Sequence, residues 1–249
     1  MMRIYLTGRL MVETDSGLVD EEDLPARQGR NAFAYLMLNR RRPIPRLELG
    51  AALWGDGPPD AWEATLSAVL SRLRRLFRNL AIDADISALS GSVNVSLPGD
   101  LWIDVDAARN ALDEAEGLMR ADHAKEAWPG AAVAVTILER GFLQGEEQPW
   151  VIHERERIHS EHLRALELLA DITLALGEWA SSVRFARLCS ELEPFRESAY
   201  EREMRAEMER GNRAEALRIY ERLRKLLADE LGTDPSPPLQ AAFLKALGN

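Results

Sequence analysis

Cysteine, lysine and long apolar runs are scarce in this 249-residue chain. A single cysteine, Cys189, excludes an internal disulfide and is typical of a reducing compartment. No uninterrupted apolar run approaches the roughly 20 residues that a membrane helix needs. The first ten residues, MMRIYLTGRL, alternate in polarity and lack the continuous apolar segment of a signal peptide. We therefore expect a cytoplasmic protein that has no membrane partner.

Motifs of catalytic and cofactor sites are missing as well. The sequence contains no Gly-rich phosphate loop and no GxSxG nucleophile motif. The string HERERIHSEH, residues 153–162, has two histidines three residues apart but neither the HExxH spacing nor a nearby cysteine. We therefore expect no metal, no cofactor and no enzymatic activity.

Positive charge is concentrated in one segment of an acidic chain with a net charge of -10. Residues 1–100 carry 12 arginines against 13 acids, and the remainder is acidic by 9 charges. Between Arg27 and Arg78, however, ten arginines face only four acids, Glu48, Asp56, Asp60 and Glu63. A basic segment in an acidic protein is typical of a DNA-reading module joined to a protein-binding module.

The segment Pro58 to Arg78 predicts an amphipathic helix with an unusual polar face. Its apolar residues recur at helical spacing and form one stripe, with Trp62 one turn earlier: Leu66, Val69, Leu70, Leu73, Leu76 and Phe77. The opposite face is small and polar at first and then basic, which suits a DNA major groove. The alternative is an ordinary surface helix whose arginines complement the negative end of the helix dipole.

The elements around this helix predict a winged helix-turn-helix over residues 1–98. Strands are expected at Arg3 to Gly8, at Arg9 to Thr14 and near Leu18-Val19. Helices are expected at Arg27 to Asn39, Arg46 to Trp54 and Trp62 to Arg78, followed by a hairpin at Ile86 to Leu97.

From Trp102 onward the pattern predicts only helices, so residues 99–249 are expected to form an all-α domain. The expected helices are Asp104 to Arg120, His123 to Arg140 with an interruption at Pro129-Gly130, Trp150 to Leu176, Ala180 to Leu192, Phe195 to Glu209 and Ala214 to Leu231. Gly177 and Gly211 lie 34 residues apart, the tetratricopeptide period. We expect these glycines to mark the turns of two stacked helical hairpins, with Trp179 and Tyr220 packed inside. The predicted fold class is mainly α, with a small β region and three helices followed by a tetratricopeptide-like repeat domain.

Several strings resemble a known family over nearly the whole chain: ALWGDGPP, TLSAVLSRLRR, WIDVDAA, ERGFLQGEEQPWV, LEPFRESAYEREMRA and GNRAEALRIYERLRKLLADELGTDPSP. They are similar to the SARP family, the Streptomyces antibiotic regulatory proteins and their relatives. The resemblance implies an OmpR-type winged helix joined to a bacterial transcriptional activator domain. It further implies a transcriptional activator that binds double-stranded DNA at tandem direct repeats, with two copies side by side, and recruits RNA polymerase.

The resemblance also indicates which residues would contact DNA. Six match the recognition-helix positions of the family: Thr65, Ser67, Ser71, Arg72, Arg74 and Arg75. Arg78 extends the basic face, and Arg41 and Arg42 are candidates for phosphate contacts beside the duplex. The chain departs from the family at the hairpin, where residues 86–97 include no Lys or Arg. An alternative function is therefore a helical-repeat adaptor that binds a protein partner and carries a vestigial winged helix.

Overall fold

The computed structural model describes residues 1–55, 57–80 and 84–248 and forms two compact units. Unit 1 contains Met1–Ala107 and Ile137–His159, and unit 2 contains Ala108–Thr136 and Ser160–Asn249. Asp56, one of the four acids in the basic segment, lies outside the described residues. The sequence-based boundary between the two functional modules, at residues 98 and 99, stays a prediction.

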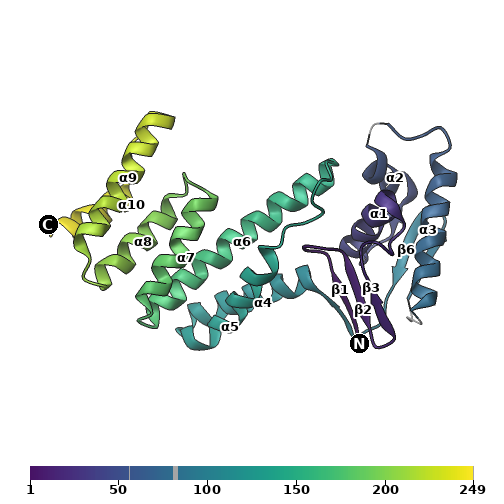
Figure 1. Ribbon diagram of the computed structural model, residues 1–249, viewed down its shortest axis with the longest axis horizontal. Coiled ribbons are helices and arrows are strands. Elements are labelled where there is room, and N and C mark those ends of the chain that lie inside the picture. The colour runs from purple at the N-terminus through teal and green to yellow at the C-terminus, as the bar shows by residue number, and fades with distance from the viewer. Residues whose placement is uncertain (56, 81–83, 249) are drawn as a thin grey trace. The chain divides into compact units, whose positions relative to one another are not determined.

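Unit 1 begins with a small sheet of strand order β3-β2-β1-β7 (Figure 1). Its strands are β1 (Met2–Tyr5), β2 (Met11–Thr14), β3 (Gly17–Val19) and β7 (Leu101–Ile103). Strand β7 runs parallel to β1 and pairs Ile103 with Ile4. The expectation of helices alone from Trp102 onward is therefore wrong. A three-residue strand has no periodic signal of its own, and this one is stabilised by a distant partner strand and by the edge-on contact of Trp102 with Tyr5 at 5.3 Å.

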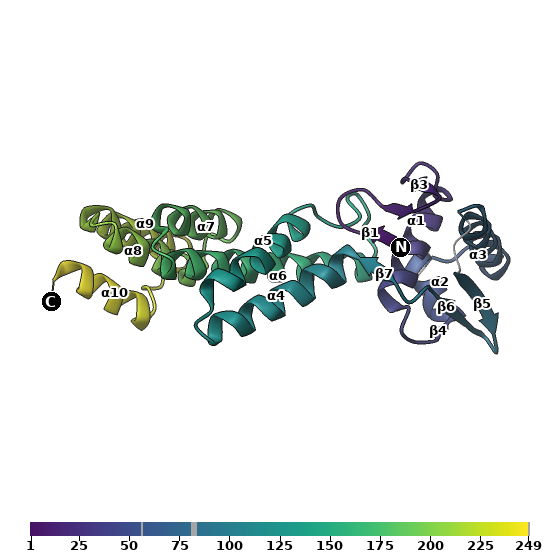
Figure 2. The same cartoon turned by 90° about the horizontal axis from the view of Figure 1, so that it is seen from below.

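Three helices and a second sheet complete the winged helix. The helices are α1 (Ala26–Asn39), α2 (Arg46–Trp54) and α3 (Trp62–Asn79), and the second sheet has the order β4 (Ile44–Pro45), β6 (Ser92–Ser96), β5 (Asp85–Leu89). Phe33 of α1 packs edge-on against Phe77 of α3. Positive φ angles at Ser90 and Gly91 allow the tight turn between β5 and β6 (Figure 2), and β5 packs against α3.

Unit 2 is built from helices that follow one another as antiparallel hairpins, and α7, α8 and α9 pack in chain order (Figure 1). The helices after β7 are α4 (Asp104–Arg120), α5 (Ala124–Leu138), α6 (Pro149–Ala175), α7 (Trp179–Leu192), α8 (Glu197–Glu209), α9 (Arg213–Leu231) and α10 (Pro237–Leu247). None of the described helices is both long and apolar enough to span a membrane.

The 34-residue repeat is present in the backbone hydrogen bonds. The Gly177 N–H donates to Leu174 O at 3.1 Å, and the Gly211 N–H donates to Met208 O at 3.0 Å. Both glycines adopt positive φ, +77° and +79°, which ends one helix and lets the chain turn into the next. The same turn joins α4 to α5, where the Asp122 N–H donates to Met119 O at 3.1 Å. These three equivalent turns establish the tetratricopeptide-like architecture.

Two sequence expectations about unit 2 are wrong. Helix α5 continues through Pro129, because flanking Ala127 and Ala131 are completely buried and Gly130 allows close approach to α4. Trp179 is 40% exposed rather than packed inside, since it is the first residue of α7 and lies at the hairpin turn. Tyr220 is buried as expected and stacks on Phe243 of α10.

Helix α10 was not anticipated, although the sequence contains signals for it. Pro237 follows Ser236 at the start, and Gly248 ends the helix in the left-handed conformation. Proline at the first helical position and glycine after the last are common helix boundaries. The helix packs on α8 and α9.

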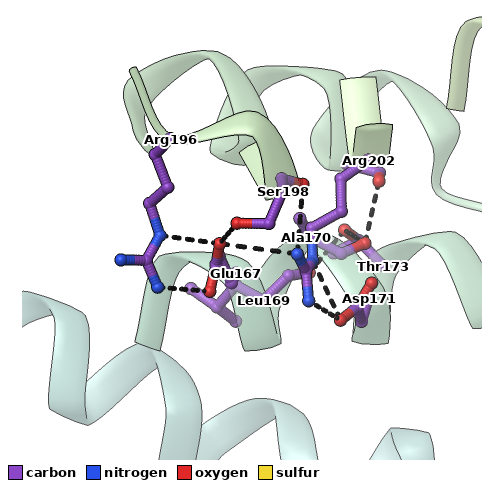
Figure 3. A network of polar contacts seen from close by, with 9 residues as sticks. Glu167, Leu169, Ala170, Asp171, Thr173, Arg196, Ser198 and Arg202 are labelled. Atoms are coloured by element: carbon purple, nitrogen blue, oxygen red, sulfur yellow. Dashed lines mark hydrogen bonds and ion pairs between the residues drawn. The ribbon is translucent and has the colours of Figure 1, made fainter. Parts of the chain in front are cut away.

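A polar network joins α6 to α8 (Figure 3). Arg196 donates two hydrogen bonds of 2.8 Å to the Glu167 carboxylate, which also accepts one from Ser198. Arg202 reaches Asp171 one turn along, at 2.9 Å. Burial acts to raise the pKa of Glu167, but the hydrogen bonds from Arg196 and Ser198 outweigh it and the pKa is lowered. The charged pairs therefore hold the first helices of neighbouring hairpins together.

Candidate nucleic-acid interface

Helix α3 buries one face completely, and that burial orients its opposite face to solvent. Leu66, Leu70 and Leu73 are all fully buried. The Trp62 ring packs on α2 at Gly50, where an added Cβ would be only 3.0 Å from ring atoms. Gly50 therefore allows the two helices of the helix-turn-helix to approach closely.

Most of the residues predicted to contact DNA are exposed in unit 1. The exposed ones are Ser67, Ser71, Arg72, Arg75 and Arg78 on α3, with Arg41 and Arg42 in the segment after α1. Thr65 and Arg74 are half-buried. Whether any of them contacts DNA remains a prediction.

The hydroxyl groups on the first half of α3 bond within the protein. Thr65 donates to Ala61 O at 3.1 Å, and Ser67 donates to Glu63 O at 2.8 Å. Arg46, at the start of α2, donates to the Ser67 hydroxyl at 2.9 Å and so extends its guanidinium over the exposed face of α3. The sequence does not show that Arg46 lies beside α3, because its position depends on how α2 packs against α3.

The predicted arginines divide into two groups by their partners. Arg74 donates to the Ile86 carbonyl and ties α3 to the hairpin. Arg42 pairs with Glu48 and donates to Asn39, and the hydrogen bond to Glu48 raises the pKa of Arg42. Arg41 lies 3.8 Å from Asp106. These three are partly committed to contacts within the protein.

The second group is available for an external anion. In residues 1–55, 57–80 and 84–248, no carboxylate lies within 4 Å of the Arg72, Arg75 or Arg78 guanidinium. Arg72 makes only a weak contact with Ala68 O at 3.4 Å. Three exposed cations on one helix therefore face solvent without a described counter-charge.

The hairpin offers little charge to a nucleic acid. Ser92 and Asn94 are half-buried, and Leu89 at the end of β5 is 67% exposed. Asp85 adds a negative charge at the start of β5. Affinity for phosphates in this unit therefore depends on α3 and its flanks.

Residues 137–159 support the helix-turn-helix in a way that the sequence analysis missed. The Glu146 carboxylate accepts hydrogen bonds from Arg27 and Asn31 of α1. Burial acts to raise its pKa, but these hydrogen bonds outweigh it and the pKa is lowered. The Trp150 indole donates to Ala52 O in α2 at 2.8 Å and packs edge-on against Tyr35. The string ERGFLQGEEQPWV therefore positions α1 and α2, although it lies far from them in sequence.

Comparison with known proteins identifies the family. Residues 103–247 match the family described as bacterial transcriptional activator domain. The chain is 32% identical to the regulatory protein AfsR of Streptomyces coelicolor, covering 86% of this chain and 21% of AfsR. It is 26% identical to the regulatory protein DnrI of Streptomyces peucetius, covering 86% of this chain and 82% of DnrI. The chain spans about a fifth of the length of the AfsR relatives that it matches.

A solved structure shares the fold. Mycobacterium tuberculosis EmbR, determined in complex with a low affinity phosphopeptide, matches with a TM-score of 0.89 at 23% identity. The match covers 99% of this chain and 65% of EmbR. The curated relatives are named as regulatory or transcriptional regulatory proteins. The chain therefore belongs to the family of regulators that carry the bacterial transcriptional activator domain, in agreement with the SARP resemblance of its sequence.

Proposed function

We propose that this protein is a sequence-specific DNA-binding transcriptional activator. Its winged helix would read promoter DNA through α3, and its helical-repeat domain would recruit RNA polymerase. The observation that supports DNA binding is the exposed face of α3, where Arg72, Arg75 and Arg78 have no described carboxylate partner. The proposal assigns the protein a regulatory role in the cytoplasm and no catalytic role.

Two copies are proposed to bind head to tail on direct repeats spaced about one helical turn, 10 to 11 base pairs. A winged helix whose hairpin has no basic residue makes few phosphate contacts, so one copy should bind weakly and a neighbouring copy would add effective concentration. The acidic residues after position 100 would be repelled by phosphates, which favours their use toward a protein partner.

Footprinting on promoter DNA, with affinity measured over a salt series, tests this proposal. A tandem site with lower affinity for each isolated half-site is expected. A two-fold inverted footprint, or full affinity for a single half-site, would rule out the tandem arrangement.

The alternative function, a protein-binding adaptor with a vestigial winged helix, also has observations in its favour. The hairpin lacks basic residues, and Arg74 and Arg42 are engaged within the protein. Affinity for genomic DNA that is no higher than for random DNA at every salt concentration would select this alternative.

A further inference from the structure

A groove in unit 2 is lined by one repeated position of the helical hairpins. Met119, Leu174 and Met208 each accept a hydrogen bond from the residue three positions later, at the turn that ends α4, α6 and α8. These equivalent residues line one cavity of about 550 Å³, together with Ala242 of α10, which follows Met208 by another 34 residues. We call this cavity, with its four-residue apolar column, the inner groove.

Most of the residues that line the inner groove are apolar, and a partly exposed tryptophan is among them. Trp179 lines the groove and is 40% exposed. Met119 and Met208 are half-buried and add two thioethers to the lining, whereas Met204 behind them is buried in the core. Flexible methionine side chains adapt to differently shaped apolar partners, and an exposed Trp provides a large contact surface.

The charges beside the column favour an acidic occupant. Arg205 and Lys245 line the inner groove, and no carboxylate in the described residues lies within 4 Å of either cation. Asp171 also lines the groove, but Arg202 neutralises it at 2.9 Å (Figure 3). Glu209 is the remaining acid among the lining residues. With Arg202 counted beside Asp171, three cations meet two acids here, so the groove carries a local excess of one positive charge in a part of the chain that is otherwise strongly acidic.

We propose that the inner groove binds an extended acidic segment of a partner protein. The large apolar side chains of this segment would pack against the column, and its carboxylates would pair with Arg205 and Lys245. This inference rests on the proposed role of the helical-repeat domain in binding a protein and states the chemistry of that partner.

The spacing of the column predicts the spacing of the apolar side chains. Packed helices lie about 8 to 10 Å apart, and a chain in the extended polyproline II conformation advances about 3.1 Å per residue with three residues per turn, so that every third side chain points to the same side. Every third residue of the bound segment would therefore meet the next residue of the column. A segment with Leu or Phe at every third position and Asp or Glu between them fits both the spacing and the charge.

Fluorescence anisotropy with a labelled ten-residue peptide of this pattern tests the proposal on the full chain. One control peptide has the same composition with its apolar residues adjacent, and another has Lys in place of the acids. We expect the patterned acidic peptide to bind at least tenfold more tightly than either control. Equal affinity for all three peptides, or binding too weak to measure, would overturn the proposal.

Variants locate the binding to the inner groove. Trp179→Ala and the double variant Arg205→Glu, Lys245→Glu should each weaken peptide binding at least tenfold. The matched controls are Trp128→Ala and Arg218→Glu, and both should bind as the wild type does. Trp128 is a similarly exposed tryptophan that lines another cavity, and Arg218 lies on the surface of α9. Equal losses in variants and controls would overturn the proposal.

DNA binding and polymerase-dependent transcription, measured on the same variants, separate this inference from the proposed function. Groove variants that lose the peptide and lower transcription but keep DNA affinity would support both. Loss of transcription with unchanged peptide binding would overturn the groove as the partner site and leave the activator function standing. Peptide binding by a protein that never activates transcription would support the groove and reject the activator function.

Discussion

Arg75 and Arg74 are neighbours in sequence but have different surroundings, so their replacement should have different effects. Arg75 is exposed with no described carboxylate partner, whereas Arg74 is half-buried and donates to the Ile86 carbonyl. Under the proposed function, Arg75→Ala removes a contact to DNA. Arg74→Ala instead loosens the hairpin from α3.

The magnitudes follow from the two environments. One phosphate contact contributes about -0.9 to the slope of log affinity against log salt. If Arg75 makes such a contact, the affinity ratio of wild type to Arg75→Ala should fall about 3.5-fold between about 50 and 200 mM salt. For Arg74→Ala we expect a loss of about 1 kcal/mol in the free energy of unfolding, because one partly solvated hydrogen bond is lost.

Anisotropy titrations on promoter DNA over a salt series, together with urea unfolding of each variant, provide both readouts. Arg218→Ala, on the surface of unit 2, is the control for nonspecific loss of positive charge. Unchanged affinity and salt slope in Arg75→Ala would refute a DNA contact by Arg75. A change of slope in Arg74→Ala equal to that in Arg75→Ala, with unchanged stability, would refute the structural role of Arg74.

Three further predictions concern the repeat domain. Tyr220→Ala should lower the free energy of unfolding by about 3 to 5 kcal/mol. Tyr220→Phe keeps the ring stacked on α10 and should lower it by less than about 0.5 kcal/mol. A small loss for both variants in urea titrations would contradict the core position of Tyr220. Gly211→Ala should lower the free energy of unfolding by about 1 to 2 kcal/mol, because the φ angle of +79° is unfavourable for a residue with a Cβ atom. Gly211→Asn should lower it less, because asparagine adopts this left-handed conformation more readily, and thermal melts of the two variants would show the difference. The lowered pKa of Glu167 means that its stabilisation is complete at neutral pH and is lost as pH falls below its ordinary value of 4.5. Unfolding titrations at neutral and acidic pH should therefore show a weaker acid dependence in Glu167→Gln than in the wild type, and equal dependence would contradict this assignment.

The repeating local patterns of the sequence determined most of the helices and the order of the two modules. Leu66, Leu70 and Leu73 recur at helical spacing, and such a stripe must be buried whatever it packs against. Gly177 and Gly211 mark turns because a left-handed backbone conformation favours glycine. These properties depend on neighbours a few residues away, which a single sequence contains.

Features that depend on distant partners were decided by the tertiary structure alone. Strand β7 exists because β1 lies beside it, and α5 continues through Pro129 because its flanking alanines are buried. Arg74 matches a recognition-helix position in sequence, yet the hairpin engages it. The inner groove arises only when α4, α6, α8 and α10 pack side by side and align one residue from each. Side chains that meet across such distances leave no pattern along the chain, so packing alone determines which cations and apolar groups remain available to a partner.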